Sequence, residues 1–208
     1  SINEIHFLNG NAYLACGFGI VVVDLDKLEV SDTYFIGDLG AQVFVNDINN
    51  DETLFYAATS SGVYFAEITN PFLANFQSWE KMDNLLNNEG DFVNIEINST
   101  YIVLQEENEN DDQISYLETS EGLTWQEWPQ FTGGIVRDIY AKEEKILVST
   151  WGSYYAVNMN LSVMDAEDEI DGVKTFAVSI IEDAAGNTWI ANEKSGLLGL
   201  SPDDEHFH

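Results

Sequence analysis

The stretch FAVSIIEDAAGNTWIANEKSGLLGL, residues 176–200, contains three short apolar runs separated by two polar turns. The runs FAVSII, TWIA and GLLGL are rich in apolar residues, many of them β-branched or aromatic, and Gly, Asn, Asp and Ser stand between them. Runs of about four to eight residues bounded by such turn residues predict β-strands. Three strands joined by tight turns predict a small antiparallel sheet.

The same arrangement of three strands occurs four more times in the chain. The other first strands are expected at 2–8, 43–49, 92–98 and 135–141, the second strands at 11–17, 54–60, 101–107 and 145–151, and the third strands at 19–25, 62–68, 113–119 and 154–160. Matching isoleucines, separated by 43, 47, 44 and 41 residues, are Ile5, Ile48, Ile95, Ile139 and Ile180. A repeat of about 40–50 residues with three or four strands is typical of propeller blades.

The physics of a blade agrees with this pattern. One small blade buries its two faces only when it lies between neighbours, so the unit must repeat. Small residues after the second strand allow close packing near a crowded axis; they are Ala15, Ala58, Ser149 and Ala191. A β-sandwich also has frequent short strands, but it does not explain five matching units. We therefore predict an all-β fold: a β-propeller with about five blade-like repeats of three to four antiparallel strands. One short helical turn is expected within 80–88.

The repeats are expected to form one propeller segment over residues 1–208. Their approximate boundaries are 2–41, 42–91, 92–134, 135–174 and 175–208. The first four leave room for a fourth strand, such as 32–36 or 124–128, whereas the fifth has little room before His208. Unpaired strand edges favour association. We therefore expect an internal fragment of a longer chain with a ring of about seven blades, or a second copy that covers the open edges.

Charge excludes several classes of partner. Seven Lys and Arg stand against 37 Asp and Glu, a net charge of −30. Nucleic acids and anionic lipid surfaces require a basic footprint, which this chain lacks. The longest membrane candidate, 20–25, is interrupted by Asp24 and is far shorter than the roughly 20 residues of a spanning helix. We expect no nucleic-acid partner, no direct membrane span and, within this sequence, no signal peptide.

Groups that carry chemistry are scarce. Cys16 lies in an apolar stretch and is interpreted as a buried small hydrophobe. His6 lies in a first strand, and His206 with His208 lacks a third metal ligand at a useful spacing. The acidic run EENENDD, 106–112, lacks the calcium-loop pattern and is interpreted as a solvated hairpin tip. No cofactor, metal site or catalytic residue is predicted.

A sugar platform is the best candidate for a binding site. Trp151 follows a second strand near an expected loop, and Tyr154 and Tyr155 come soon after it. Their rings could stack on sugar C–H surfaces, with Arg137 supplying charge; the competing interpretation is packing between blades. The net charge of −30 suits an anionic glycan poorly unless Arg137, Lys142 and Lys145 gather locally or a divalent cation bridges.

Residues 118–125, ETSEGLTW, resemble the Asp-box of sialidase-like propellers. Gly122, Thr124 and Trp125 match, whereas Glu118 and Ser120 stand where that pattern has Ser and Asp. The motif is a structural turn remote from catalysis. Sialidases use an arginine cluster, and Arg137 is the only arginine in the chain. We therefore expect a protein that is not an enzyme, and a hydrolytic propeller is the least favoured hypothesis.

Residues 180–197, IIEDAAGNTWIANEKSGL, resemble the two-component-regulator propeller repeat. Its pattern is roughly I-x-E-D-x-x-G-N-x-W-I-A-T-x-x-G-L, and Asn192 departs from the usual Thr. This resemblance implies a propeller blade and says nothing about the ligand. It suits an oligosaccharide-sensing propeller in the periplasm, from a hybrid two-component system.

Residues 2–79 resemble part of the first propeller of the PorZ-like family, cell-surface components of type IX secretion in Bacteroidota. The resemblance rests on segments 2–40, 54–68 and 72–79, and GFGI at 17–20 with DTY at 32–34 is its most distinctive part. It covers just over a third of the chain and implies an internal piece of a longer protein.

The PorZ-like resemblance implies a non-enzymatic scaffold or ligand-presenting propeller at the outer face of the outer membrane. In that family the partners are a sortase and outer-membrane proteins of an attachment complex, which links cargo to an anionic lipopolysaccharide. The GFGIVVVDLDK segment, 17–27, favours this hypothesis over the periplasmic sensor.

Overall fold

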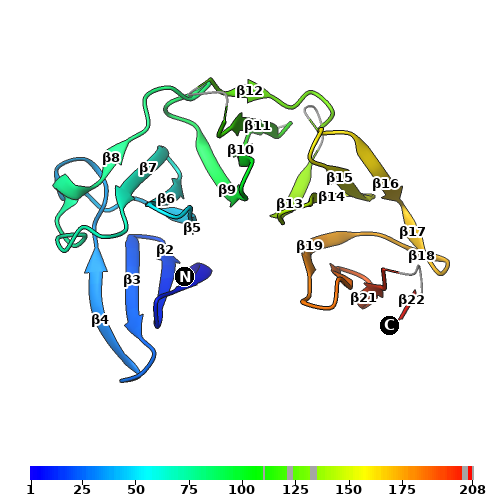
Figure 1. Ribbon diagram of the computed structural model, residues 1–208, viewed down its shortest axis with the longest axis horizontal. Helices are drawn as coiled ribbons and strands as arrows, with labels where there is room; N and C mark the ends of the chain where they lie inside the picture. Colours follow the sequence, from blue (N-terminus) through cyan, green and yellow to red (C-terminus); the bar gives the residue numbers. More distant parts are fainter. Residues whose placement is uncertain (110, 121–123, 132–134, 203–205, 208) are drawn as a thin grey trace. The chain divides into compact units, whose positions relative to one another are not determined.

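The protein is described from a computed structural model, which covers residues 1–109, 111–120, 124–131, 135–202 and, by backbone alone, 206–207. Within these residues the chain forms five four-stranded antiparallel sheets (Figure 1). Each sheet corresponds to one expected repeat, and its strands follow one another in chain order. The predicted all-β propeller fold with five blades is confirmed.

The blades are numbered in chain order. Blade 1 contains β1 (Ile2–Leu8), β2 (Asn11–Cys16), β3 (Gly19–Asp24) and β4 (Glu29–Tyr34). Blade 2 contains β5 (Val45–Asn50), β6 (Leu54–Thr59), β7 (Gly62–Glu67) and β8 (Glu80–Lys81). Blade 3 contains β9 (Asp91–Ile97), β10 (Tyr101–Glu107), β11 (Gln113–Glu118) and β12 (Gln126–Glu127).

Blades 4 and 5 follow the same order. Blade 4 contains β13 (Val136–Ala141), β14 (Lys145–Thr150), β15 (Tyr154–Asn158) and β16 (Val163–Glu167). A small hairpin of β17 (Glu169–Ile170) and β18 (Val173–Lys174) connects it to blade 5. Blade 5 contains β19 (Ala177–Glu182), β20 (Thr188–Asn192), β21 (Gly196–Leu200) and β22 (His206–Phe207).

Two expectations about elements are wrong. Residues 80–88 contain β8 and no helix; the amide of Met82 donates to Val63 O at 2.8 Å and extends the pairing with β7. In the described part of the chain the helical elements are 3-10 turns, η1 (Asp38–Gly40) and η2 (Phe76–Ser78). Blade 5 does have a fourth strand, because two residues suffice for β22 to pair with β21.

The chain divides into two compact units, which are described separately. Unit 1 contains residues 1–108 and 113–128, with blades 1, 2 and 3. Unit 2 contains residues 109–112 and 129–208, with blades 4 and 5. The division of the whole chain into one segment of five repeats with the boundaries above stays a prediction, as does the ring of about seven blades.

The core of unit 1 lies between adjacent blades. Blades 1 and 2 enclose a cluster in which Ile20 and Phe55 are fully buried, and the rings of Tyr13 and Phe55 lie 4.8 Å apart. Blades 2 and 3 enclose a second cluster, which includes Ile95 and Trp125. The central strands are buried on both faces, since residues 55–59 of β6 and 101–106 of β10 are all buried, which explains why an isolated blade would be unstable.

Each first strand carries one extra residue relative to the second strand. These bulge residues are Asn3, Asn46, Val93, Arg137 and Val178. In unit 1 a bulge amide bonds the next blade: Asn3 Nδ2 donates to Val45 O at 2.7 Å, and Asn46 Nδ2 donates to Phe92 O at 2.8 Å. A bulge redirects its side chain, and here it turns an amide toward the neighbouring blade.

The residue after the bulge ties two pairs of blades together. Asp47 Oδ2 in blade 2 accepts from the amide of Ile95 in blade 3 at 2.8 Å. In unit 2, Asp138 Oδ2 in blade 4 accepts from the amide of Ile180 in blade 5 at 2.9 Å. The two bonds occupy the same place in the repeat, so the carboxylate is a structural link from one blade to the next.

The acidic run at 106–112 is buried at both ends, so its interpretation as a solvated tip is wrong there. Glu106 is 5% exposed and accepts from Asn87 Nδ2 at 2.6 Å. Asp112 is 6% exposed and accepts from the amide of Val136 at 2.8 Å. Buried carboxylates need hydrogen-bond donors, and these two carboxylates have them.

Candidate functional site

The candidate site in blade 4 begins at Arg137 and Trp151. Arg137 occupies the bulge of β13, where unit 1 has Asn3 and Asn46. Trp151 follows β14, and its amide donates to Ile135 O at 3.2 Å. The bulge directs the Arg137 guanidinium over the indole, with Cζ 5.1 Å from the ring centroid. This is a cation–π contact.

Two residues of blade 5 extend this contact. The Phe176 ring lies 6.4 Å from the Trp151 ring at 74°, an edge-to-face arrangement. Lys194 Nζ lies over the Phe176 ring, 3.6 Å from its centroid. We call the four residues Arg137, Trp151, Phe176 and Lys194 the cation–aromatic ladder. Trp151 remains 49% exposed, and Gly152 beside it has open space where a side chain would lie.

The ladder differs from the other basic side chains in what its cations contact. Lys27, Lys81 and Lys174 each pair with at least one acidic side chain, and Lys142 and Lys145 both pair with Glu182. Among the described residues, Arg137 and Lys194 have no carboxylate within ion-pair distance, although the chain has 37 acidic residues. Both cations lie on aromatic rings instead, and both side chains are exposed.

The structure brings Trp151 and Arg137 together but places the two tyrosines elsewhere. Tyr154 is 4% exposed, and its hydroxyl donates to Asp165 Oδ2 at 2.9 Å. Tyr155 packs edge-to-face against Phe131 at 5.2 Å. Neighbouring residues in a strand point to opposite faces, so the two tyrosines do not form one platform with Trp151.

Lys142 and Lys145, which an anionic glycan would need near Arg137, pair with a carboxylate of blade 5. Lys142 Nζ lies 3.3 Å from Glu182 Oε1, and Lys145 Nζ pairs with Glu182 Oε2. Lys142 also donates to Asp183 O at 3.1 Å. These lysines therefore neutralise a carboxylate at the first turn of blade 5.

Sequence reasoning missed Phe176 and Lys194. Lys194 is positioned by Asn192, which is 5% exposed: its Nδ2 donates to Lys174 O at 2.8 Å, and its Oδ1 accepts from the amide of Lys194 at 3.0 Å. Asn192 is the position that departs from the regulator repeat. This departure is the one sequence feature that points to the Lys194 position. The longer Asn side chain carries its acceptor and its donors on separate atoms, so it can bond Lys174 O and the Lys194 amide at the same time.

The other candidate residues have structural contacts. His6 Nε2 lies 2.6 Å from Asn50 Oδ1, which links blades 1 and 2. Cys16 is buried, and burial raises the pKa of its thiol. In the described ranges no cluster of three or more His, Cys, Asp or Glu is placed to hold a metal ion. Residues 121–123 and the side chains of His206 and His208 lie outside the described residues.

The regulator-like motif of blade 5 is a rigid turn. Asp183 Oδ1 accepts from the amides of Ala185 and Asn187 at 2.8 and 3.0 Å. Its Oδ2 accepts from Trp189 Nε1 at 2.9 Å and from the Asn187 side chain at 2.8 Å. The Trp189 and Asn187 donors hold the pKa of Asp183 well below its usual range. Carboxylate and indole therefore have a structural role here.

The comparisons with known proteins agree with the blade pattern. The family model "TSS9, PorZ, N-terminal beta-propeller domain" matches residues 1–80. This match covers blade 1 and β5 to β7 and confirms the PorZ-like resemblance expected for residues 2–79. No curated protein sequence matches the chain.

Solved structures are similar at low sequence identity. PorZ of Porphyromonas gingivalis, described as an essential bacterial surface component of the type IX secretion system, has a TM-score of 0.73 at 14% identity. The extracellular domain of BT3049 from B. thetaiotaomicron, described as a hybrid two-component system, has a TM-score of 0.69 at 14% identity. All of this chain is covered in both cases, with 25% and 28% of the other chains.

BamB from Moraxella catarrhalis is a third similar structure, with a TM-score of 0.66, 10% identity, and coverage of 100% of this chain and 60% of that chain. The chain spans about a quarter of the length of PorZ and of the BT3049 domain. At these identities the similarity shows the propeller fold. No helix in the described ranges is long and apolar enough to cross a membrane.

Proposed function

We propose that the chain is a non-enzymatic, ligand-presenting propeller segment of a PorZ-like component of type IX secretion. It acts at the outer face of the outer membrane and assists a sortase in linking cargo to an anionic lipopolysaccharide. The family match over residues 1–80 carries this proposal. The scarcity of catalytic groups in the sequence supports a role in binding rather than in catalysis.

The cation–aromatic ladder is the surface that we assign to the glycan. An exposed indole offers a flat apolar face to a sugar ring, and Arg137 and Lys194 offer charges that no carboxylate occupies in the described structure. The net charge of −30 opposes an anionic ligand. Interactions with charges beyond about 8 Å are largely screened at physiological ionic strength, so the two cations of the ladder reduce this repulsion at the point of contact.

The partner proposal is tested in the full-length parent protein. Tagged parent is captured from Bacteroidota outer membranes, and bound proteins are identified by mass spectrometry. We expect a sortase and its outer-membrane partners. Recovery of inner-membrane kinase peptides alone, or of no partner, would contradict the secretion hypothesis.

The glycan proposal is tested with lipopolysaccharide purified from the same outer membranes. Replacing Trp151 with Ala removes the stacking face, and R137Q removes one cation; each is expected to weaken binding about tenfold at 150 mM salt, in line with one lost charge-assisted or stacking contact. The matched control is K27Q, which removes a cation already paired with Asp24. Equal binding by all the variants would assign the glycan to another surface.

A periplasmic oligosaccharide sensor of a hybrid two-component system is the second candidate function. It is favoured by the regulator-like turn at Asp183 and by the similarity to the BT3049 extracellular domain. This hypothesis predicts binding to neutral oligosaccharides that does not weaken with salt. Strong salt dependence of glycan binding, lost in R137Q, would count against it.

A further inference from the structure

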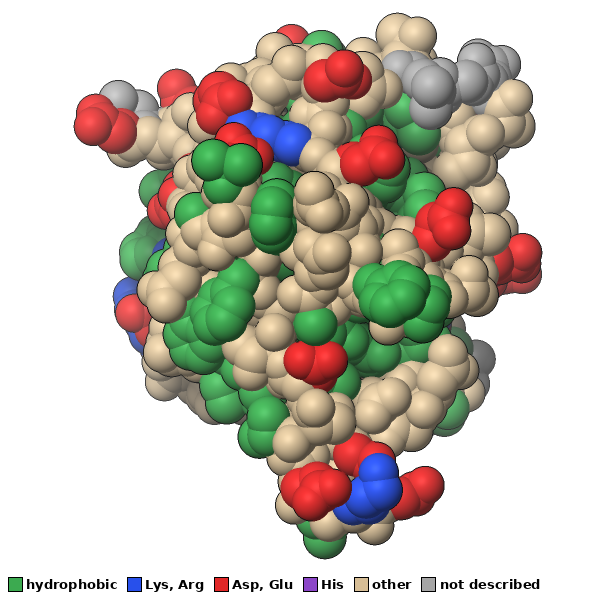
Figure 2. Space-filling view, turned by 90° about the vertical axis from the view of Figure 1, so that its left-hand side faces the viewer, with side chains coloured by type: hydrophobic (Ala, Val, Ile, Leu, Met, Phe, Trp, Pro, Cys, Tyr) green, Lys and Arg blue, Asp and Glu red, His purple; other side chains and the backbone are tan. Residues whose placement is uncertain are grey.

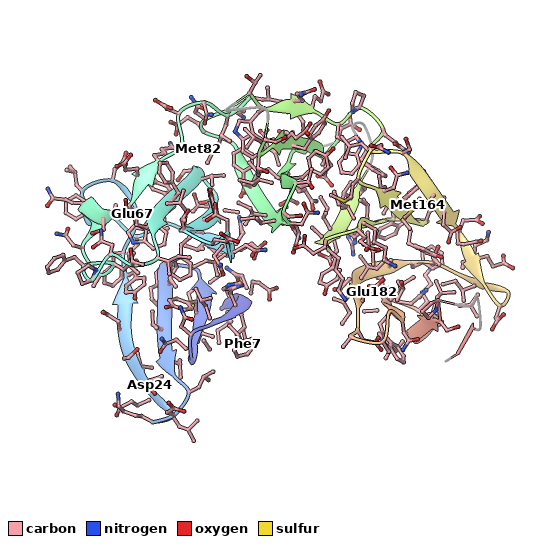
Figure 3. All side chains as sticks on the ribbon, in the orientation of Figure 1. Phe7, Asp24, Glu67, Met82, Met164 and Glu182 are labelled. Carbon is pink, nitrogen blue, oxygen red and sulfur yellow. The ribbon has the colours of Figure 1, made fainter. Side chains whose placement is uncertain are left out.

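A pocket of about 410 Å³ opens between blades 2 and 3 of unit 1, whereas the ladder belongs to unit 2. Its blade 2 wall includes Leu54 and Phe65, and its blade 3 wall includes Ile102 and Leu117. Met82, on the segment between the two blades, completes the lining and is labelled in Figure 3. The volume lies within the range of about 300–1,000 Å³ that is typical of small-molecule sites.

The lining is mostly apolar and partly aromatic. Tyr56, Ile102, Leu117 and Trp125 are each at most 6% exposed, and they belong to the hydrophobic cluster between blades 2 and 3. The pocket therefore extends from the surface to the edge of this hydrophobic cluster. An apolar ring or branched alkyl group that enters it would remove apolar surface from water, which is favourable.

Trp125 supplies a buried polar group of the lining that lacks a partner in the described structure. Its Nε1 is buried and has no hydrogen-bond acceptor. Tyr56, the other buried residue of the lining with a polar side-chain group, already donates its hydroxyl hydrogen to Asp51 Oδ2 at 2.9 Å. A buried N–H without an acceptor is destabilising, and such groups are few in native proteins. An oxygen acceptor on a ligand would satisfy it after a small movement of the indole.

The charged residues at the pocket limit the charge of the ligand. Glu80 and Asp83 line it and are exposed, whereas Lys81 Nζ is already 2.7 Å from Glu89 Oε1. In Figure 2, which faces the outer side of blades 1 and 2, basic side chains likewise lie against acidic ones. A carboxylate or phosphate would therefore meet repulsion here, whereas an uncharged carbonyl oxygen would not.

We propose that this pocket binds a small uncharged molecule with an aromatic or branched apolar body and one carbonyl oxygen, which accepts from Trp125 Nε1. The site is independent of the glycan proposal, because it uses no residue of the ladder and lies in the other unit. It would give the propeller a second ligand on the outer side of two blades.

Three matched probes test this proposal by NMR. They are 2-acetonaphthone, with a ring and a carbonyl group; 2-ethylnaphthalene, with no acceptor; and 2-naphthoate, with a carboxylate. The indole N–H signal of Trp125 is identified as the one missing in W125F. We expect 2-acetonaphthone to bind most tightly and to move this signal downfield, and 2-naphthoate to bind most weakly.

Two variants sharpen the result. W125F keeps an aromatic ring but removes the donor, so 2-acetonaphthone should lose about two- to tenfold in affinity, while 2-ethylnaphthalene should keep its affinity. L54W fills the pocket from a half-buried position and should abolish binding of both without changing Trp125. Unchanged binding in L54W, tightest binding by 2-naphthoate, or no shift of the Trp125 signal would overturn the proposal.

Discussion

Blade 1 and blade 2 have the same four-stranded sheet but differ in how their first strands are covered. Ile48 in β5 is 2% exposed, whereas Ile5, at the same place in β1, is 43% exposed. Phe7, two residues further along β1, is 65% exposed. Blade 2 contacts blades 1 and 3, whereas in the described part of unit 1 blade 1 contacts blade 2 alone. The strand pattern builds the sheet, but only a neighbouring blade buries its isoleucine.

The largest expected effect is a difference between two identical substitutions. I48A removes a buried side chain between blades and should lower the free energy of unfolding of unit 1 by about 2–5 kcal/mol. I5A should lower it by less than about 1 kcal/mol, because that side chain is already half in water. Hydrogen exchange of the β6 amides in both variants measures the difference. Equal losses would show that the exposed face of blade 1 contributes as much as a packed interface.

The next effect concerns the carboxylate link between blades. D47A leaves the amides of Ile48 and Ile95 without their acceptor and should destabilise unit 1 by about 1–3 kcal/mol. The corresponding residue in blade 1, Glu4, accepts from the exposed amide of Ile5, so E4A should cost about a few tenths of a kcal/mol. Urea unfolding measures both variants, and D47N, which keeps one acceptor oxygen, should lie between them.

A smaller expected effect is a difference in acid sensitivity between the first turn of blade 2 and the first turn of blade 1. Burial alone raises the pKa of Asp51 in blade 2, but the amides of Thr53 and Leu54 and the Tyr56 hydroxyl outweigh it and hold the pKa below its usual value. The stabilisation by Asp51 is therefore fully present above about pH 4 and is lost as the pH falls through the lower folded pKa. Blade 1 has Asn9–Gly10 at this turn, which does not titrate. Unfolding curves between pH 2 and 7 should show a smaller acid loss in D51N than in the unchanged protein. An identical loss in both would assign the acid sensitivity to other carboxylates.

The smallest expected effect on stability comes from a substitution on the exposed face of β1, which should change self-association instead. Figure 3 labels Phe7 on β1, whose exposed face we expect to bind a second copy or another blade. F7D should leave unfolding nearly unchanged and reduce the mass measured by light scattering at high protein concentration to that of a monomer. L28D, at an 81% exposed turn residue, is the matched control and should still associate. A monomeric unchanged protein would contradict this prediction.

The sequence predicted the fold because the interior repeats. The isoleucines at 48, 95, 139 and 180 are at most 2% exposed, and this regular burial is what produced the repeated pattern. Short strands were harder to find: β8 and β22 have two residues each, too few for any alternation. The prediction of a short helical turn at 80–88 was wrong because β8 is too short to show a strand pattern. The polar residues around it resemble the start of a helix.

The candidate site was predictable only in part. Trp151 and Arg137 were singled out by residue type, but their contact depends on a bulge that pairs two residues with one and leaves no sequence signal. Phe176 and Lys194 come from another blade, so no spacing within a repeat connects them to Trp151. The buried ends of the acidic run were missed because their donors, Asn87 and the Val136 amide, are distant in sequence.

The carboxylate links between blades can form only in the order in which the chain is synthesised. Asp47 and Ile95, whose amide donates to it, are 48 residues apart, and Asp138 and its donor Ile180 are 42 residues apart. In both pairs the carboxylate comes first in the chain and the amide comes one blade later. At a synthesis rate of about 5–20 residues per second, the Asp47 carboxylate waits about 2–10 s for Ile95. The carboxylate of each linked blade thus lacks its partner until the next blade has been synthesised. The links between blades therefore form one blade behind the growing end of the chain.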